Sequence, residues 1–505
     1  MGKSPGPRII VTLAGPTLAA LEAQAVRLGG PPVGYEFRLD YLKEFDDFEL
    51  KFHQMLVRLR FPQTVATCRR QEAGGQFAGS VKDQCAILQA AVRAGCQWVD
   101  LEVESLHGAS KALLRELRPA KVIVSYHNYK KTPPMGAIHR RFARLPVAAV
   151  KVAGHARQLR DNLQILRVLK SRAAKRGPKV VGVAMGPSGL PTRLLALRWG
   201  SLFTYASPAN HHGVAAGQLP WDVMRSLYRV ERLDHRTKLY GVVGTHAAMS
   251  LSPTMHNAAF QAKRVNAIYL PCQAPTLSDF VGFAKALGFQ GFSITMPFKR
   301  TIIRHLDWLD PLARQIGACN TVALQRGEWM GWNTDAAAVV EILTKRLRLA
   351  GSRILILGAG GAARAAAFAL RAEGAEVLLA ARREAATRSL ARQVSAQAVS
   401  WSSANNQDVD AVINATPVGM APHTEGLPID LSRLRVRVVF DMVYYPLETR
   451  FLAEARGRGL ITISGIEMLV AQGARQFEIW TGQAAPRALM EQAVRHALSH
   501  PIAAS

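Results

Sequence analysis

The stretch that most constrains the fold is Arg353–Arg383, which reads RILILGAGGAARAAAFALRAEGAEVLLAARR. A short apolar run leads into Gly358-Ala359-Gly360-Gly361, and an alanine-rich helical pattern and a second apolar run follow. This order predicts a strand, a tight turn, a helix and a strand, the unit that binds a dinucleotide pyrophosphate. Ala362 continues the turn, and Ala363 stands where GxGxxG has its third glycine. Because such turns also close ordinary α/β units, the turn alone leaves a structural role open.

The end of the second apolar run indicates which dinucleotide is bound. An acidic residue there would accept the ribose 2′-hydroxyl of NAD. This chain has Arg382 and Arg383 instead. Guanidinium groups suit a 2′-phosphate, so we expect NADP(H).

Length and composition limit the class of protein. A chain of 505 residues is too long for one core, so two or three domains are expected. No stretch approaches a membrane-spanning helix, and Met1–Pro7 resembles a short polar leader, so we expect a cytoplasmic protein with no membrane partner. The five cysteines have neither disulfide nor metal-site spacing. We therefore expect reduced core thiols and no metal.

The formal net charge of +28 raises the question of a nucleic-acid partner. However, the arginines are spread along the whole chain, with no basic tail and no run of five like charges. We expect solvated helix faces and no nucleic-acid partner. A positive surface would still attract small carboxylates and nucleotide phosphates.

The first half alternates short apolar runs with amphipathic stretches. Eight such units in about two hundred residues predict a (β/α)8 barrel, with an open doubly wound sheet as the alternative. The expected strands are Ile9–Leu13, Tyr35–Leu39, Thr64–Cys68, Trp98–Val103, Lys121–Ser125, Ala148–Val152, Lys179–Ala184 and Ser201–Tyr205.

Polar residues lie within or just after these runs, where barrel enzymes build their sites. They are Glu36, Arg38, Arg69, His127, Lys151, Arg193 and Gln218. Lys151 lies between apolar neighbours, so we expect its amine to face a dry interior where burial and nearby arginines favour the neutral form. A neutral amine can form a Schiff base with a ketone.

His127 ends the preceding run and is expected to titrate near neutrality and to move a proton beside Lys151. The arginines suit a substrate carboxylate. The alternatives are a lysine that reaches solvent from a strand end and a histidine that is only a structural hydrogen-bonding group.

Five segments of this half resemble type I 3-dehydroquinate dehydratase. They are EFRLD (36–40), TCRR (67–70), SYHNYKKTP (125–133), VKVAG (150–154) and MGPSGLPTR (185–193). The resemblance implies that Lys151 forms the imine, His127 is the general acid/base and Arg193 binds the carboxylate. Ala73 replaces a frequent Glu, with Glu72 one place early, and Val214 replaces a serine. These departures bear on a contact of the substrate loop and not on the imine chemistry.

The second half begins a new α/β pattern after a basic stretch, Leu219–Lys238, that predicts an amphipathic helix. Upstream of the dinucleotide unit it carries hydroxyl, amide, amine and carboxylate side chains that suit a small polyhydroxy acid facing a nicotinamide. Lys299 can protonate the alkoxide formed on hydride delivery, and Asp335 can orient that proton. Ser250, Ser252, Asn320 and Asp335 also fit caps and turns, which is the structural alternative.

This half resembles shikimate dehydrogenase in SLSPTMHNAAF (250–260), TMPFK (295–299), CNTV (319–322), NTD (333–335), GAGGAAR (358–364), NATPVGM (414–420), DMVYYP (441–446) and GIEMLVAQ (465–472). The resemblance implies that Lys299 and Asp335 are catalytic. The implied shikimate contacts are Ser250, Ser252, Thr295, Asn320, Asp335, Tyr444 and Gln472. The implied NADP contacts are Gly358, Ala359, Gly360, Gly361, Ala362, Arg382, Arg383, Thr416, Met442 and Gly465. Met249, Ser293 and Ala381-Arg382-Arg383 depart from the common pattern.

Together these observations predict a bifunctional enzyme of the shikimate pathway, which leads to chorismate and the aromatic amino acids. It would dehydrate 3-dehydroquinate and reduce the resulting 3-dehydroshikimate to shikimate. The expected domains are a barrel (1–230), a substrate-binding domain (231–336), a Rossmann domain (337–465) and returning helices (466–505). Oxidation of quinate, or a basic scaffold with inactive sites, are the rival interpretations. Oligomeric state and transfer of the intermediate between sites are left open.

Overall fold

The computed structural model describes residues 7–29, 33–106, 110–171, 174, 176–208 and 217–500. The expected leader up to Gly6 and the departure at Val214 lie outside these residues. The chain forms two compact units. The first runs to Thr237 and includes Cys272–Ala286, and the second contains Lys238–Pro271 and the chain from Leu287 onward.

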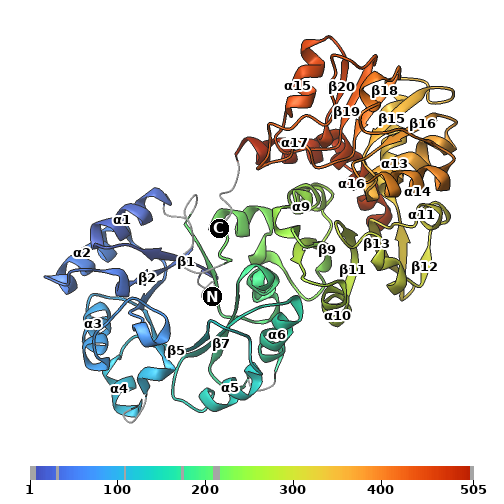
Figure 1. Cartoon of the computed structure of the whole chain (residues 1–505). Coiled ribbons are helices and arrows are strands. Elements are labelled where there is room, and N and C mark those ends of the chain that lie inside the picture. The colour runs from blue at the N-terminus through green and yellow to red at the C-terminus, as the bar shows by residue number, and fades with distance from the viewer. Residues whose placement is uncertain are drawn as a thin grey trace. The chain divides into compact units, whose positions relative to one another are not determined.

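The first unit is built on eight parallel strands in the order β7-β6-β5-β4-β3-β2-β1-β8. They are β1 (Ile9–Ala14), β2 (Gly34–Arg38), β3 (Thr64–Thr67), β4 (Trp98–Glu102), β5 (Lys121–Asn128), β6 (Ala149–His155), β7 (Lys179–Met185) and β8 (Thr204–Ala206). The N–H of Leu202, just before β8, donates to the carbonyl of Val180 in β7 at 2.8 Å, which nearly closes the ring. The predicted barrel is confirmed, and the open sheet is wrong (Figure 1).

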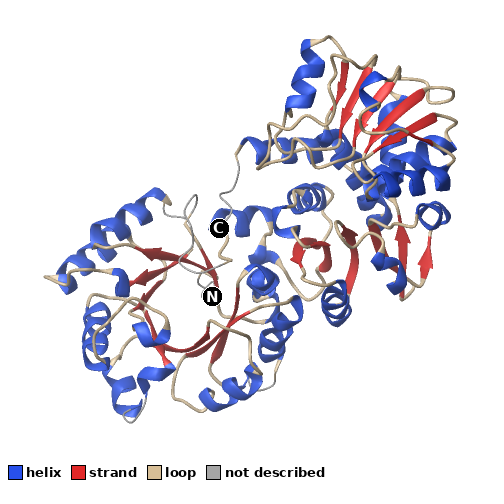
Figure 2. Cartoon of the chain, in the orientation of Figure 1, coloured by secondary structure: helices blue, strands red, loops and turns tan. Residues whose placement is uncertain are grey.

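Helices surround the ring of strands, as the secondary-structure colouring shows (Figure 2). They are α1 (Leu18–Arg27), α2 (Phe48–Leu59), α3 (Val81–Arg93), α4 (Ser110–Glu116), α5 (Met135–Phe142), α6 (Asn162–Lys170) and α8 (Leu190–Leu195). The start of α3 is fixed by a capping box, in which Ser80 and Asp83 each bond the other's backbone N–H. The apolar faces of these helices pack on the outer faces of the strands.

The predicted helix over Leu219–Lys238 is wrong. The structure has a short π-helical segment, Val223–Leu227, and a 3-10 turn, Val230–Arg232. Arg229 between them has a φ of 51°, a left-handed conformation that ends a right-handed helix. Charge periodicity alone did not reveal this break.

The first unit gains α10 (Leu277–Leu287) up to Ala286 from later in the chain. The fully buried carboxylate of Asp279 accepts from the backbone N–H of Leu159 at 2.7 Å and of Arg160 at 3.0 Å. These N–H groups lie in the 3-10 turn Leu159–Asp161, which follows β6. By its contacts, Cys272–Ala286 groups with the first unit, whereas the sequence analysis placed it in the substrate-binding domain.

The second unit contains two sheets. The first has the order β10-β9-β11-β13-β14-β12. Its elements are β9 (Lys238–Gly244), α9 (Ser252–Ala262), β10 (Ala267–Gln273), β11 (Phe289–Ile294), β12 (Trp308–Leu309), α11 (Pro311–Ile316), β13 (Thr321–Gln325), β14 (Glu328–Trp332) and α12 (Thr334–Thr344).

The second sheet is parallel, with the order β17-β16-β15-β18-β19-β20. Its elements are β15 (Arg353–Leu357), α13 (Gly361–Ala372), β16 (Glu376–Ala380), α14 (Glu384–Val394), β17 (Gln397–Ala398), β18 (Ala411–Asn414), β19 (Val438–Asp441), α15 (Arg450–Gly457) and β20 (Ile461–Ile463). This is the 3-2-1-4-5-6 order of a Rossmann fold. The chain adds strands outward on one side of β15 and then, from β18, on the other side. The predicted Rossmann domain is confirmed.

Two helices complete the second unit, α16 (Gly465–Thr481) and α17 (Arg487–Ser499). Helix α16 packs Met468 and Ala471 into the core of the Rossmann sheet. It packs Val470 and Phe477 into the core of the other sheet. One helix therefore joins both sheets of this unit.

Within the described ranges, no helix is long and apolar enough to cross a bilayer. In the same part of the chain, no cluster of three or more His, Cys, Asp or Glu side chains could hold a metal ion. All five cysteines are buried and free.

Candidate active sites

The interior of the barrel changes from an apolar layer of side chains to a polar layer two residues further along the strands. Residues two apart on a strand share a face, so each strand presents alternate side chains to the interior. The apolar floor includes Ile10, Val65, Trp98, Ile123 and Ala149. Two residues further along the same strands lie Thr12, Thr67, Asp100, Ser125 and Lys151, all buried. The polar site therefore rests on a packed floor at the carboxyl ends of the strands.

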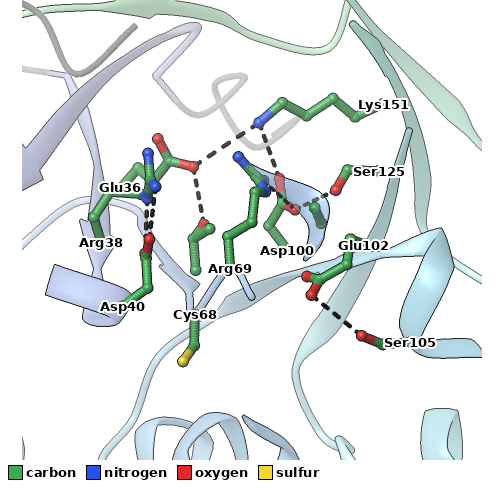
Figure 3. A network of polar contacts seen from close by, with 12 residues as sticks. Glu36, Arg38, Asp40, Cys68, Arg69, Asp100, Glu102, Ser105, Ser125 and Lys151 are labelled. Carbon is green, nitrogen blue, oxygen red and sulfur yellow. Dashed lines mark hydrogen bonds and ion pairs between the residues drawn. The ribbon is translucent and has the colours of Figure 1, made fainter. Parts of the chain in front are cut away.

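Lys151 lies in β6 with its amine between two carboxylates (Figure 3). The amine donates to Asp100 Oδ2 at 3.0 Å and lies 3.9 Å from Glu36 Oε1. It also lies 4.2 Å from the ring centroid of Tyr205. The expected burial is present. Carboxylates contact the amine directly, and the expected arginine, Arg69, lies beside it through their shared partner Asp100.

Asp100, in β4, connects these groups and was not identified from the sequence. It accepts from Arg69 at 2.9 Å and from the Ser125 hydroxyl at 2.6 Å, in addition to Lys151. Burial acts to raise the pKa of Asp100, but the charges of Lys151 and Arg69 outweigh burial and hold it well below its usual range. Asp100 therefore stays ionised. Its place two residues after Trp98 in a barrel strand was the signal available.

Glu36 and Gln218 belong to the same polar layer. Glu36 accepts from the hydroxyls of Thr12 at 2.8 Å and Thr67 at 2.9 Å. Gln218 donates to the Thr12 hydroxyl at 3.2 Å. The structure thus brings Glu36, Gln218 and Lys151 together, as predicted for a single site.

Two predicted arginines lie at different points of the barrel. Arg38 makes a bidentate pair with Asp40, at 2.8 and 2.7 Å, so a substrate would share this guanidinium with a carboxylate. Arg193 lies in α8 after β7, and burial lowers its pKa to about 10. A buried guanidinium of this kind gains most from an anionic ligand.

His127 lies on β5, two residues beyond Ser125, which pairs with Lys151 in the strand register. The imidazole therefore faces the same interior as the lysine. Burial, followed by the positive charges of Arg69 and Lys151, lowers the pKa of His127 well below its ordinary value. The expectation that it titrates near neutrality is wrong, and the imidazole is held neutral.

The loop that contains Ala73 packs beside His127 through Tyr129. The Nδ1 atom of His127 is buried without a hydrogen-bond partner among the described residues. Glu72, one place before Ala73, pairs with Arg70 at 2.9 Å, and its own side chain is largely exposed. The Tyr129 ring stacks on His127 with centroids 5.8 Å apart, and its hydroxyl donates to the Ala73 carbonyl.

The second site centres on Lys299 and Asp335. The amine of Lys299 donates to Asp335 Oδ2 at 2.6 Å, and Asn320 donates to Asp335 Oδ1 at 2.8 Å. Asp335 lies in the first turn of α12, and Lys299 follows β11. A Cβ on Gly361 would lie 3.4 Å from Lys299 Cδ. The catalytic pair predicted from the sequence therefore lies beside the start of the dinucleotide helix.

The other predicted shikimate contacts lie on several elements of this unit. Thr295 directly follows β11 and is half-buried. Tyr444 packs against the core that contains α16, and Gln472 lies on α16 and donates to the Leu469 carbonyl. The hydroxyl of Ser250 accepts from the N–H of Ser252 at 3.2 Å, the local bond that the capping alternative predicts. These contacts stay predictions.

The glycine-rich turn has the geometry of a phosphate-binding loop. Gly358 has a φ of 121°, which favours glycine, and a Cβ there would lie 3.0 Å from the Ala415 carbonyl. A Cβ on Gly360 would meet nothing within 4 Å, so the space beside the turn is open. Ala359 and Ala362 flank this opening, and Gly361 begins α13. The N–H groups at the start of α13 can therefore hold a pyrophosphate.

The remaining predicted cofactor residues follow strands β16, β18 and β19 of the same sheet or begin α16. Arg382 and Arg383 follow β16, are exposed, and form no ion pair with any residue in the described ranges. Thr416 follows β18 and donates to Asn414 Oδ1 at 2.6 Å. Met442 packs on the Rossmann core, and a Cβ on Gly465 would lie 2.3 Å from the Val443 carbonyl oxygen. This donor set fits an NADP pyrophosphate and 2′-phosphate.

Protein-family models divide the chain between residues 235 and 242, and the second of them includes α10. Type I 3-dehydroquinase matches residues 9–235. The shikimate dehydrogenase substrate binding domain matches residues 242–322, and the shikimate 5′-dehydrogenase C-terminal domain matches residues 465–495.

Individual relatives span both halves or the second half alone. The chain is 32% identical over 479 residues to a chloroplastic bifunctional 3-dehydroquinate dehydratase/shikimate dehydrogenase of Arabidopsis thaliana, covering 90% of this chain and 79% of that protein. It is 40% identical over 275 residues to a shikimate dehydrogenase (NADP(+)) of Thermococcus kodakarensis, covering 53% of this chain and 99% of that protein. A crystal structure of the Thermus thermophilus shikimate 5-dehydrogenase with NADP(H) and shikimate matches 52% of this chain and 100% of its own, with 37% identity and a TM-score of 0.49.

Proposed function

Because the chain belongs to the family of bifunctional 3-dehydroquinate dehydratase/shikimate dehydrogenases, we propose a residue-level course for its two reactions. The chain is a lyase and an NADP-dependent oxidoreductase of the shikimate pathway. The observation that carries the proposal is the presence of two lysine–carboxylate pairs, one at the mouth of the barrel and one beside the dinucleotide turn.

In the barrel, the Lys151 amine attacks the C3 ketone of 3-dehydroquinate. The neutral imidazole of His127 is available to accept a proton from the reacting groups. Loss of water from the carbinolamine gives an iminium that acidifies the C2 proton. His127 removes that proton, the C1–O bond breaks, and the protonated imidazole supplies the proton with which the hydroxyl leaves as water. Hydrolysis of the iminium releases 3-dehydroshikimate and restores Lys151.

The polar layer around Lys151 suits a cyclic hydroxy acid. Arg193 is buried and receives the substrate carboxylate. The ring hydroxyls and the ketone oxygen of the substrate form hydrogen bonds with Glu36, Arg38, Arg69 and Gln218. Asp100 holds the amine of Lys151 in place at 3.0 Å before the substrate arrives.

Borohydride trapping tests this assignment. Reduction in the presence of 3-dehydroquinate should fix a stable adduct on Lys151, which peptide mass analysis will locate. The Lys151→Ala chain should give no adduct and no 3-dehydroshikimate while still reducing 3-dehydroshikimate with NADPH. Undiminished dehydration by Lys151→Ala would refute the imine mechanism.

In the second unit, bound NADPH supplies a hydride to the ketone carbon of 3-dehydroshikimate. Lys299 donates a proton to the resulting alkoxide, and Asp335 holds the amine in the direction of that oxygen. The ring hydroxyls and the carboxylate of the substrate are bound by Ser250, Ser252, Thr295, Asn320, Tyr444 and Gln472. The glycine turn and Arg382 and Arg383 hold the phosphates.

Substitution of Lys299 tests the second half in the same chain. A positioned general acid contributes roughly 10²- to 10⁴-fold, so Lys299→Ala should lower the reduction rate by about that factor. Dehydration by the barrel should be unchanged and reports the concentration of folded enzyme. Reduction by Lys299→Ala at the normal rate would refute the role of this pair.

The partners of this enzyme are then small molecules, namely 3-dehydroquinate, 3-dehydroshikimate, shikimate and NADP(H). We place it in a reducing compartment such as the cytoplasm, which the five free, buried cysteines support. A thiol titration of the purified native chain and after unfolding tests that all five are reduced.

A further inference from the structure

A chain of buried hydrogen bonds ends at the carboxylate of Asp335. The Tyr269 hydroxyl donates to Ser293 Oγ at 2.6 Å, and Ser293 donates to Gln476 Oε1 at 2.7 Å. Gln476 Nε2 donates to Thr321 Oγ1 at 3.1 Å. The links come from β10, β11, α16 and β13, and all four side chains are buried.

The last links reach the catalytic pair. Thr321 donates to Asn320 Oδ1 at 2.8 Å, and the N–H of Thr334 donates to the same oxygen at 2.8 Å. Because these two donors fix the amide oxygen of Asn320, its Nδ2 must face the other way. Asn320 Nδ2 donates to Asp335 Oδ1 at 2.8 Å, and Lys299 donates to Asp335 Oδ2 at 2.6 Å. Each donor points toward the carboxylate, so each bond polarises the next.

Gln476 is the residue on which the direction of the chain depends. Its Nε2 also faces the backbone carbonyl of Asn320 at 3.4 Å, and a carbonyl only accepts. The amide is therefore held with Nε2 toward Asn320 and Oε1 toward Ser293. The Nε2 atom of His256 lies 3.3 Å from Gln476 Oε1. Burial lowers the pKa of His256 to about 3, so its imidazole is neutral.

We propose that Gln476 is a positioning residue for the reduction. It holds Asn320 so that the Asn320 amide aligns Asp335 with Lys299. Ser293 contributes one hydroxyl that links Tyr269 to Gln476. The proposal rests on the proposed roles of Lys299 and Asp335, which the Lys299→Ala variant tests separately.

The central test is Gln476→Leu in the full chain. Loss of the link should lower kcat for NADPH-dependent reduction of 3-dehydroshikimate about tenfold, the effect of one hydrogen bond of typical strength. KM for both substrates should change less than about twofold, because the Gln476 side chain is buried among protein groups. The primary deuterium isotope effect from 4-deuterated NADPH should rise as the chemical step slows. The dehydration rate of the same chain reports the folded concentration.

Two further variants separate positioning from packing. In Gln476→Glu, a protonated carboxyl can replace both hydrogen bonds, so kcat should be near normal at low pH and fall as the carboxyl ionises. Trp480→Phe removes a hydrogen bond of 2.9 Å from the same helix to the Val322 carbonyl, without touching Asn320. It should lower the thermal midpoint and leave kcat unchanged.

The outcomes that overturn the proposal are concrete. A kcat within twofold of normal in Gln476→Leu would do so, as would an equal fall in Trp480→Phe. If Gln476→Leu does not fold, Ser293→Ala and Gln476→Glu decide. Ser293→Ala should lower kcat about threefold, since Gln476 keeps its bonds to Thr321 and Asn320. An unchanged kcat in Ser293→Ala together with a pH-independent Gln476→Glu would refute it.

Discussion

Replacement of Asp100 by Asn removes one negative charge from the centre of the barrel site. The amide has nearly the same volume as the carboxylate and keeps an oxygen that can accept from the Ser125 hydroxyl. In the natural chain this hydroxyl lies 2.6 Å from Asp100 Oδ1. It leaves Lys151 and Arg69, which lie 3.0 and 2.9 Å from the carboxylate oxygens, without their shared anion. Loss of one partner from a buried ion pair costs about 3–5 kcal/mol, because a buried charge is left unpaired. We expect a loss of stability of that size, confined to the first unit.

The same change should slow dehydration. Without Asp100, the nearest carboxylate to the Lys151 amine is Glu36 at 3.9 Å, so the amine should move toward it. A displacement of about 1 Å from the attack position costs roughly a hundredfold in rate.

Two measurements on the full chain check both effects. Urea denaturation followed by tryptophan fluorescence gives stability, and the ultraviolet absorbance of the enone product gives the dehydration rate. Ser125→Ala is the matched control, since it removes one hydrogen bond from the same carboxylate but no charge, and it should cost less, about 1.5–3 kcal/mol. Reduction of 3-dehydroshikimate should be unaffected in both variants. If Asp100→Asn unfolds at the normal urea concentration and dehydrates at the normal rate, the carboxylate is not what holds Lys151.

Two further predictions concern the Rossmann sheet. Exchange of both Arg382 and Arg383 for Ala should raise KM for NADPH roughly a hundredfold, because charge-assisted hydrogen bonds are lost, and should leave KM for NADH nearly unchanged. Steady-state assays with both cofactors check this prediction. An equal rise in KM for NADH would contradict it. Burial raises the pKa of Asp441 from 3.8 to about 6, so its protonated form stabilises the fold by about 3 kcal/mol below pH 4, and this contribution is lost as the pH rises through 6. Relative to Asp441→Asn, the natural chain should therefore lose stability between pH 4 and 7, and parallel urea curves for the two proteins over that range would show the inference to be wrong.

Local sequence patterns predicted most of the fold. The eight apolar runs of the first half are the eight barrel strands, and Gly358–Gly361 is the turn of a Rossmann fold. Strands of this kind are recognisable because each repeats apolar side chains at a fixed period over several residues. The helix expected over Leu219–Lys238 failed because one left-handed residue, Arg229, interrupts the pattern without changing its composition.

The electrostatics of the sites were less accessible to sequence. Asp100 in β4 contacts Lys151 in β6, two strands away. The sequence does not give the strand register that places these two side chains at the same level of the barrel. Burial, followed by the non-local charges of Arg69 and Lys151, lowers the pKa of His127 well below the value near 6.5 that a lone histidine predicts. The link through Gln476 was missed for the same reason, since its partners Ser293 and Thr321 lie more than a hundred and fifty residues away.

The two lysines that we propose as catalytic show how similar lysine–carboxylate pairs can serve opposite chemistry. Imine formation needs an amine that gives up a proton, whereas reduction needs one that donates a proton to an alkoxide. Lys151 is buried among Asp100, Glu36 and the Tyr205 ring, beside a neutral imidazole that can take its proton. Lys299 keeps a partly exposed side chain on a turn, where one carboxylate aligns it and water can return its proton. Exchange of Lys299 for Arg should therefore retain more reduction than Lys299→Ala, whereas Lys151→Arg should abolish dehydration as completely as Lys151→Ala, because a guanidinium cannot form the imine.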